Sequence, residues 1–399
     1  MELLARFAPL EKEMVKLSNG LCRTLYDEIV PEEDLPPFSR STMDGFAVKA
    51  RDTFGCSESE PALIQVIGEI AMGHPGDELE IEHGQAARIW TGGALPRGAD
   101  SVVMVEYTNS IDERTIEVFR PVAPGENVIA KGEDFRAGEK AFSKGHTLRP
   151  QDLGVLAGLG FTTVPVFRRP KVAIISTGDE LVPPEKTPKP GQIRDINSTT
   201  LSALIQEAGA LEMPFGIIGD DPDVMQQACE KALEQGADII LLSGGSSVGR
   251  RDFTLTVFKR LKGAELLAHG VSVRPGKPTI LAQIGNKALF GLPGHVASAM
   301  VVFYLFVRPL IRLMAGQGLS LGLVETEALC GQEIPSVSGR EDFVRVKLEK
   351  MAKEERPRAF PVWGRSGLLN PLVKADGLLV IPRDSEGFEK GEAAKVLLF

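Results

Sequence analysis

The sequence contains few of the residues that build metal clusters and disulfide scaffolds. Its four cysteines (Cys22, Cys56, Cys229 and Cys330) lie far apart and form no CxxC pair. This excludes a cysteine zinc framework and a disulfide scaffold, and we expect a reducing, cytoplasmic location. The five histidines form no HExxH motif, and the chain has no Gly-Lys-Ser/Thr. Zinc hydrolase and Walker A chemistry therefore lack support.

Long apolar runs and a basic charge balance are also absent. The most apolar run, residues 296–307, has about 12 residues, whereas a bilayer span needs roughly 20, so we expect a buried helix there. The N-terminus carries acids from Glu2 onward and lacks a signal-peptide pattern. The formal net charge of −9 argues against general nucleic-acid binding. We therefore expect no membrane and no nucleic-acid partner.

What is present describes a globular protein of 399 residues with 43% hydrophobic and 25% charged residues, enough for roughly two to four domains. Residues 1–30 are predicted to be helical, because Leu10, Met14 and Leu17 follow spacings of four and three. From residue 45 to 145, short alternating segments separated by turns predict a small β domain.

The pattern changes near residue 170. Two buried strands of the parallel type are predicted at 171–176 and 237–242, and the segments between them predict a helix at 198–209, a strand at 213–219 and a helix at 220–236. For the last helix, Asp221 is the expected N-cap, Pro222 lies in the first turn, and Gly236 follows the end. This order predicts a doubly wound α/β layer, closed by a long helix that Pro309 should kink. Beyond residue 325, short strands predict a terminal β domain.

Acidic residues follow the predicted strands. Glu180 and Asp252 lie in loops that leave the same edge of a parallel sheet, and Asp220 follows a third strand. Carboxylate oxygens at that edge are the ligands that Mg²⁺ takes, with water and substrate phosphate completing its shell. Helix caps and solvated turn acids remain the alternative.

The stretch SGGSSVGRRD (243–252) leaves a strand through a loop of small residues. Glycines let a backbone approach an anion closely, and basic residues follow at Arg274 and Lys277, the latter between two prolines. A structural turn with surface cations is the competing interpretation. In the β-rich region, Asp44 and Thr91 lie in polar loops where they can hydrogen-bond a heteroaromatic ligand or simply stabilise a turn.

Nine motifs together resemble the molybdopterin molybdenumtransferase family, which includes the gephyrin E domain. The resemblance runs from about residue 30 to the C-terminus. In order, the motifs are STMDGFAV, TGGALPRGADSVVMVE, GEDFRAGE, STGDELV, GQIRDINS, GIIGDDPD, SGGSSVG, RPGKPT and GLPG.

This resemblance implies an enzyme that inserts molybdenum from molybdate into adenylyl-molybdopterin and releases AMP, assisted by Mg²⁺. It implies an elongated, dimeric subunit of mixed α/β and β class. Its expected parts are a linking domain (1–44 and 146–169), a β-rich domain with the MDG, TGG and GED motifs (45–145), a doubly wound molybdopterin-binding α/β domain (170–324) and a C-terminal β barrel (325–399). Implied partners include the molybdopterin adenylyltransferase and downstream molybdoenzymes.

The resemblance also implies roles for matching residues. Asp44, Thr91 and Asp134 match positions that line the cleft, which in this family joins two subunits, and Lys277 matches a position facing an oxyanion. The residues that match substrate-binding positions of the family are Gly244, Gly245, Ser246, Ser247, Arg274, Pro293, Arg345 and Ser366. The last two are implied to be directed toward molybdate. Glu180, Asp220 and Asp252 match the acidic positions expected to hold Mg²⁺.

The chain departs from the family pattern at two loops, and in the first of these the family usually has SGGVSVG where this chain carries Ser246. The family usually has GLPGNPVSA, whereas this chain has GLPGHVASA, with His295 and Val296 replacing Asn and Pro. The choice between molybdate and tungstate therefore stays open. Molybdopterin adenylyltransferase is a second alternative, and a non-catalytic scaffold is a third; the MDG, GED and C-terminal segments argue against the former, and retention of every acidic candidate argues against the latter.

Overall fold

The computed structural model describes residues 2–244, 253–352 and 354–399. The chain forms two compact units, and each is described by itself. Unit 1 contains Met1–Glu13, Cys22–Tyr26 and Val166–Phe399, and unit 2 contains Met14–Leu21 and Asp27–Pro165.

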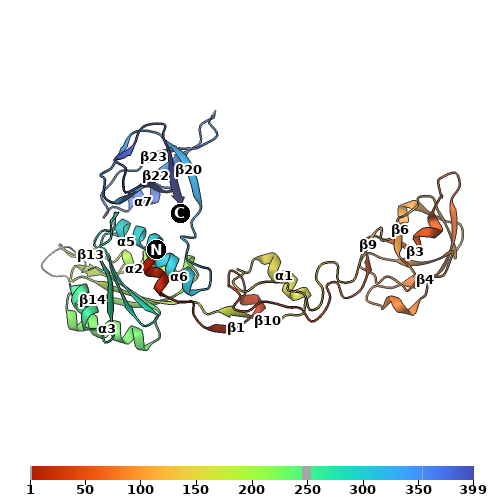
Figure 1. The fold of residues 1–399 in the computed structure, drawn as a ribbon, viewed down its shortest axis with the longest axis horizontal. Coiled ribbons are helices and arrows are strands. Elements are labelled where there is room, and N and C mark those ends of the chain that lie inside the picture. Colours follow the sequence, from red (N-terminus) through yellow and green to blue (C-terminus); the bar gives the residue numbers. More distant parts are fainter. Residues whose placement is uncertain (1, 245–252, 353) are drawn as a thin grey trace. The chain divides into compact units, whose positions relative to one another are not determined.

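Unit 1 is built on a six-stranded sheet (Figure 1). In spatial order its strands are β14 (Leu211–Ile218), β11 (Lys171–Thr177), β15 (Ile239–Ser243), β19 (Lys287–Leu292), β18 (Ile280–Ile284) and β16 (Glu265–His269). The first four are parallel, and β18 and β16 are antiparallel to their neighbours. The predicted strands at 171–176, 213–219 and 237–242 are confirmed.

Helices cover both faces of this sheet. Successive side chains of its buried strands point to opposite faces, so both faces are apolar and both must be covered. Val172 and Ile174 of β11 lie in one core cluster, whereas Ala173 and Ile175 lie in another. The first cluster includes residues of α2 (Asn197–Glu207) and α6 (Arg308–Met314); the second includes residues of α3 (Pro222–Glu234) and α4 (Phe253–Arg260). The predicted doubly wound layer is therefore present.

The ends of α3 agree with the sequence prediction. The Asp221 carboxylate accepts a hydrogen bond from the Asp223 N–H at 2.8 Å, Pro222 is the first helical residue, and Gly236 follows the end at φ +84°. A glycine there adopts the left-handed conformation without steric cost.

The apolar segment near residue 300 is a core helix with an irregular centre. It consists of α5 (Val296–Val302), a π-helical turn (Phe303–Val307) and α6. This described helix is long and apolar enough to cross a membrane, but 72% of its apolar window is buried inside the protein. Pro309, which has no N–H to donate, is the second residue after the π turn, near where the sequence predicts a kink.

The C-terminal region of unit 1 is a closed five-stranded barrel. Its strands are β22 (Glu341–Glu349), β23 (Arg358–Pro361), β20 (Glu325–Cys330), β26 (Ala393–Leu398) and β24 (Gly377–Ile381), and pairing of β22 with β24 closes it. Short elements complete the region: β21 (Ile334–Pro335), β25 (Gly387–Phe388) and α7 (Asn370–Lys374).

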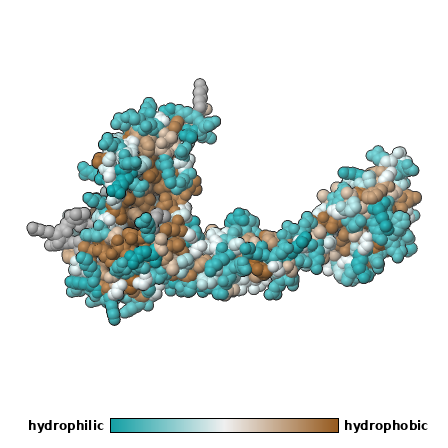
Figure 2. All heavy atoms as spheres, in the orientation of Figure 1, coloured by the Kyte–Doolittle hydropathy of each residue, from teal (hydrophilic) through white to brown (hydrophobic). Residues whose placement is uncertain are grey.

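The barrel packs directly on the α/β layer. Strand β17 (Val273–Arg274) leaves the α/β layer to pair with β22, and one buried cluster joins Val273, Val301 and Leu305 to Phe343, Leu378 and Leu397 of the barrel. Figure 2 shows hydrophobic residues gathered at this junction on the face drawn. This apolar contact fixes the barrel loops beside the sheet edge.

Unit 2 contains a second six-stranded sheet. In spatial order its strands are β6 (Ser101–Met104), β3 (Gly45–Val48), β5 (Gln85–Ile89), β4 (Ala62–Ile70), β8 (Thr115–Val118) and β7 (Thr108–Ser110). The β domain predicted at 45–145 therefore exists as a sheet. Other elements are β2 (Arg40–Ser41), β9 (Val128–Ile129), α1 (Pro150–Gly158) and the short helical turns Ala50–Thr53, Gly76–Glu78 and Val105–Tyr107.

The helix predicted over residues 1–30 is wrong. The segment forms short helical turns at Glu2–Arg6 and Leu17–Asn19 and a strand, β1 (Lys12–Lys16), which pairs with β10 (Thr163–Phe167). Met14, expected on the buried helix face, is 58% exposed. Pro9 lacks an N–H and disfavours helix in the residue before it, so a single helix over residues 1–30 would be interrupted just before Leu10. Leu4, Phe7 and Leu10 instead pack in the α/β core.

The short strands β12 (Leu181–Val182) and β13 (Ile193–Arg194) pair in parallel beside the loops that follow β11. The proposed division into four domains stays a prediction, because the α/β layer and the barrel share one compact unit.

Candidate functional site

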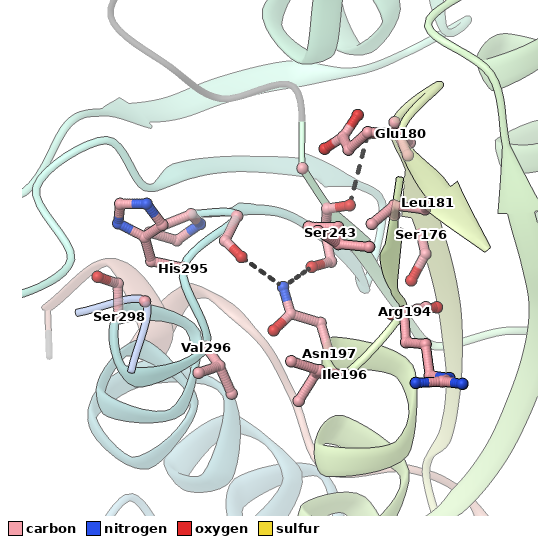
Figure 3. A pocket seen from close by; sticks show the side chains of 18 of the residues that line it. Ser176, Glu180, Leu181, Arg194, Ile196, Asn197, Ser243, His295, Val296 and Ser298 are labelled. Carbon is pink, nitrogen blue, oxygen red and sulfur yellow. Dashed lines mark hydrogen bonds between the residues drawn. The ribbon is translucent and has the colours of Figure 1, made fainter. Parts of the chain in front are cut away.

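The carboxyl ends of three parallel strands meet at one edge of the α/β sheet. Ser176 of β11 is in register with Ser243 of β15, which is in register with Leu292 of β19. The loops that follow these strands line a cavity of about 580 Å³, termed here the strand-edge cavity (Figure 3). The sequence prediction that these loops share one edge is confirmed, and ligands of open α/β sheets bind at such edges.

Gly244 begins the Gly/Ser loop in a conformation that requires glycine. Its φ is +108°, and a Cβ built there would lie 2.3 Å from the carbonyl oxygen of Thr177. The end of β15 therefore lies in close contact with the end of β11, and Gly244 lines the strand-edge cavity. Gly245, Ser246, Ser247 and Asp252 lie outside the described residues, so their predicted roles stay predictions.

Two predicted carboxylates line the strand-edge cavity. Glu180 comes from the turn after β11, and Asp220 follows β14. Their oxygens suit Mg²⁺, which is commonly held by one or two carboxylates, waters and substrate phosphates. Within residues 2–244, 253–352 and 354–399, no group of three or more His, Cys, Asp or Glu side chains has the arrangement of a metal site. Glu180 and Asp220 thus fit Mg²⁺ that is shared with water and a ligand, and the third predicted acid, Asp252, lies outside the described residues.

Sequence reasoning missed Asn197, which ties together two loops of this edge. Its side-chain N–H groups donate to Ser243 Oγ at 2.7 Å and to the Gly294 carbonyl at 2.8 Å (Figure 3). Both partners line the cavity, as does Pro293 between β19 and α5. Asn197 lies in the motif GQIRDINS, but the motif by itself does not indicate that this side chain would join two loops.

A buried acid of the same motif supports this corner. Asp195 is 5% exposed and accepts hydrogen bonds from the backbone N–H and hydroxyl of Ser198 at 3.1 and 2.5 Å. The Ser198 hydroxyl also contacts Ser176 Oγ at 2.7 Å. These bonds join the start of α2 to the end of β11, so the cavity wall is held by polar contacts.

A second cavity, of about 730 Å³, lies between the barrel and the α/β layer and is termed here the barrel cavity. Its lining includes Arg274 and His295 from the α/β layer, and Arg345, Arg365 and Ser366 from the barrel. The predicted residues Arg274, Arg345 and Ser366 are therefore brought together.

Arg345 supplies the most informative group in the barrel cavity. Its Nη2 donates to the Gly364 carbonyl, while its buried Nη1 has no hydrogen-bond partner in the described chain. Burial lowers the pKa of this guanidinium, although an arginine keeps its charge in proteins. A buried donor without a partner is costly, so it indicates a place for an acceptor that the protein itself does not supply.

Arg274 is partly committed to another partner. Its Nη1 lies 3.2 Å from the carboxylate of Asp342, which is 2% exposed and also contacts Arg340 at 3.1 Å and Ser336 Oγ at 2.8 Å. Three arginines (Arg274, Arg345 and Arg365) and one acid, Asp342, thus line the barrel cavity, which gives these four a net charge of +2 and favours an anion.

Lys277 is placed differently from the other cations. Its side chain is exposed and lines neither cavity, although the adjacent Pro278 lines the strand-edge cavity and Pro275 lines the barrel cavity. Its assignment to an oxyanion stays a prediction.

In unit 2 the structure brings Asp44 and Thr91 together. Asp44 Oδ1 accepts hydrogen bonds from the Thr91 backbone N–H at 2.8 Å and its hydroxyl at 2.7 Å. These two bonds lower the pKa of the Asp44 carboxyl, the backbone bond contributing most. The third predicted residue, Asp134, is exposed, and its backbone N–H donates to the Leu35 carbonyl at 3.1 Å.

These features define a class of protein: an α/β ligand-binding protein with two neighbouring cavities, one at the strand edge that presents carboxylates and one under a barrel that favours an anion. Three family models match the chain. They match the MoeA N-terminal region (domain I and II) at residues 1–160, a probable molybdopterin binding domain at 173–313 and the MoeA C-terminal region (domain IV) at 327–399.

Relatives align over nearly the full length. The chain is 35% identical over 392 residues to a molybdopterin biosynthesis protein of Methanocaldococcus jannaschii, covering 96% of this chain and 91% of the relative. It is 34% identical over 392 residues to the molybdopterin molybdenumtransferase of Bacillus subtilis, covering 97% and 90%. A crystal structure of a molybdopterin biosynthesis protein from Pyrococcus horikoshii matches with a TM-score of 0.83 at 36% identity, covering 100% of this chain and 97% of that one. The chain belongs to the MoeA family of molybdopterin molybdenumtransferases.

Proposed function

We propose that this protein transfers molybdenum from molybdate to adenylyl-molybdopterin and releases AMP. Membership of its family gives it a role in molybdenum cofactor biosynthesis. The observation that carries the detailed proposal is the buried, unpartnered Nη1 of Arg345, because it marks an anion position beside the strand-edge cavity. The proposed reaction has two anionic reactants, so it needs two anion-binding positions.

The two cavities divide the reactants in this proposal. The phosphate-bearing pterin occupies the strand-edge cavity, where backbone at Gly244 and the predicted Gly245, Ser246 and Ser247 approach it closely. Molybdate occupies the barrel cavity, where the guanidinium of Arg345 and the hydroxyl of Ser366 can donate to its oxygens. The chain's main contribution is then to hold two mutually repelling anions in contact.

Mg²⁺ would be held by Glu180 and Asp220, with Asp252 as a third proposed ligand. When bound, this ion would supply positive charge to the pyrophosphate that is cleaved. The carboxylates would orient it at the sheet edge, and the arginines of the barrel cavity would bind the incoming oxyanion. Lys277 is proposed to add a further point charge.

We further propose a homodimer in the cytoplasm, in which Asp44, Thr91 and Asp134 of one subunit complete the site of the other. The free state of all four cysteines supports a reducing compartment. Adenylyl-molybdopterin would come from a molybdopterin adenylyltransferase, and the product would pass to molybdoenzymes.

The test is to incubate the purified protein with adenylyl-molybdopterin, Mg²⁺ and either molybdate or tungstate, and to follow AMP release. We expect oxyanion-dependent release that falls in Arg345→Met but not in Arg358→Met, a barrel arginine that does not line the cavity. AMP release that does not depend on the presence of molybdate or tungstate would refute the proposal. Formation of adenylyl-molybdopterin from molybdopterin and ATP would favour the adenylyltransferase alternative, and a preference for tungstate would identify a tungsten insertase.

A further inference from the structure

His295 lines both cavities. It lies on the loop after β19 and lines the strand-edge cavity (Figure 3). It also lines the barrel cavity. His295 is one of the three positions, 295 to 297, at which this chain differs from the GLPGNPVSA pattern. It thus lies at the point where the two proposed reactants approach each other.

The imidazole is directed to the barrel rather than to its own helix. His295 is the N-cap residue of α5, but its side chain makes no capping hydrogen bond. Instead, Nδ1 lies 2.7 Å from Ser366 Oγ. The backbone adds a second link, since the Ala297 N–H donates to the Ser366 carbonyl at 3.1 Å. A Cβ placed on Gly367 would lie 3.6 Å from the His295 ring, so the ring packs beside that glycine.

The hydrogen bond to Ser366 allows two proton arrangements with opposite consequences. If Nδ1 carries no proton, it accepts the Ser366 O–H, and the hydroxyl presents only lone pairs to the cavity. If Nδ1 carries a proton, it donates to Oγ, and the hydroxyl proton is free to point at an anion. A doubly protonated imidazole permits only the second arrangement, because both of its nitrogens are donors.

We infer that His295 is a positioning residue for oxyanion binding, which acts by setting the direction in which Ser366 donates its hydroxyl proton. This inference rests on the proposed oxyanion site at Arg345 and Ser366. An oxyanion in the barrel cavity selects the arrangement in which Nδ1–H donates to Ser366 Oγ. Protonation of the imidazole therefore favours binding, and binding favours protonation by the same factor.

Other charged groups line the two cavities beside the imidazole, and their effect on molybdate binding must be distinguished from that of His295. Arg274, Asp342, Arg345 and Arg365 line the barrel cavity, and Glu180, Arg194, Asp195 and Asp220 line the strand-edge cavity. The arginines keep their charge over the accessible pH range. The carboxylates remain in place when His295 alone is changed, so a comparison of wild type with a His295 variant isolates the imidazole.

The experiment measures binding of molybdate alone to the full-length protein by calorimetry, from about pH 5.5 to pH 8, the range in which histidine changes charge. For the wild type, we expect affinity to rise about five- to tenfold toward low pH, a fraction of the effect of one charge-assisted hydrogen bond. His295→Asn should bind at all pH values with a flat profile, because an amide offers a donor that does not titrate.

A double-mutant cycle tests whether His295 acts through Ser366. In a Ser366→Ala background, His295→Asn should leave the remaining pH dependence unchanged. A purely structural bridge predicts the opposite pattern, in which His295→Asn lowers the melting temperature and weakens binding equally at every pH. His295→Gln, with thermal unfolding measured alongside, provides a second variant if the first does not fold.

The outcomes separate this inference from the function on which it rests. If wild type binds molybdate, Arg345→Met weakens that binding, and the His295→Asn profile follows the wild type, the inference is overturned and the oxyanion site stands. If wild type binds no molybdate at any pH, the oxyanion site itself is refuted, and the role of His295 falls with it.

Discussion

Replacing Arg345 with methionine should separate binding from stability. Methionine keeps much of the aliphatic stem but removes the guanidinium, whose Nη1 is buried without a partner and whose Nη2 donates to the Gly364 carbonyl. A residue retained for folding would be expected to satisfy its own donors. We therefore expect a large effect on the oxyanion and a small one on the fold.

The expected magnitudes follow from two opposing effects on the free energy of unfolding. Losing the charged hydrogen bond to Gly364 costs about 1.5–3 kcal/mol, while removing a desolvated and unsatisfied donor returns about 1–3 kcal/mol. The net change should thus lie within about 2 kcal/mol of zero. Molybdate loses a charge-assisted hydrogen bond with nothing in return, so its affinity should fall roughly tenfold to 150-fold.

Urea denaturation and calorimetric titration with molybdate measure the two quantities on the same preparations. Arg358→Met is the matched control, because this barrel arginine contacts Glu354 and does not line the cavity. A variant that unfolds readily yet binds molybdate normally would reverse both expectations, and it would assign Arg345 to the barrel's structure.

Four further predictions concern other parts of the molecule. Hydrogen bonds from the Arg149 side chain, from the Arg149 backbone N–H and from His146 hold the pKa of Asp152 far below its usual range. The stability that this gives should be complete above about pH 4 and be lost as pH falls through the lowered pKa, so in urea titrations Asp152→Asn should lose less stability than wild type on acidification. Gly244→Ala should cost about 2 kcal/mol or more, because the added Cβ meets a carbonyl oxygen at 2.3 Å, whereas Gly209→Ala, also at positive φ but in open space, should cost less in the same denaturation assay. Lys277→Met should weaken binding of molybdate or adenylyl-molybdopterin about tenfold or more, and normal titrations of both ligands would leave it a surface cation. Verified heterodimers of Asp44→Ala and Asp252→Ala subunits should recover AMP release through one intact site, and a dead heterodimer would count against shared sites.

The α/β layer could be predicted because its information is local. Buried strands such as Lys171–Thr177 are continuous apolar runs, and Asp221, Pro222 and Gly236 mark the ends of a helix through their own backbone preferences. The prediction of an N-terminal helix was wrong because it also used local information alone. Three apolar residues at helical spacing do not show which distant segment the chain will pair with. There, pairing of β1 with β10, some 150 residues away, decides the conformation.

The cavities could not be predicted in this way, because they depend on contacts between distant segments. The sequence suggested that Glu180, Asp220 and Pro293 share a sheet edge, since strand order and direction imply it. Nothing local indicated that Asn197 would bond the loop after β19, or that Arg345 would keep one nitrogen without a partner. Such facts depend on which distant segments of the chain meet, which is a property of tertiary structure.

One loop connects the chemistry on the two sides. Pro293 faces the strand-edge cavity, and two residues later His295 reaches Ser366 in the barrel cavity, while the Gly294 carbonyl between them is held by Asn197. The Asn197 bond at the centre of the loop holds Pro293 and His295 in place on either side of it, so both cavities share one fixed segment of backbone. A substitution at His295 therefore changes a group that lines both cavities, whereas a substitution at Ser366 changes the barrel cavity alone.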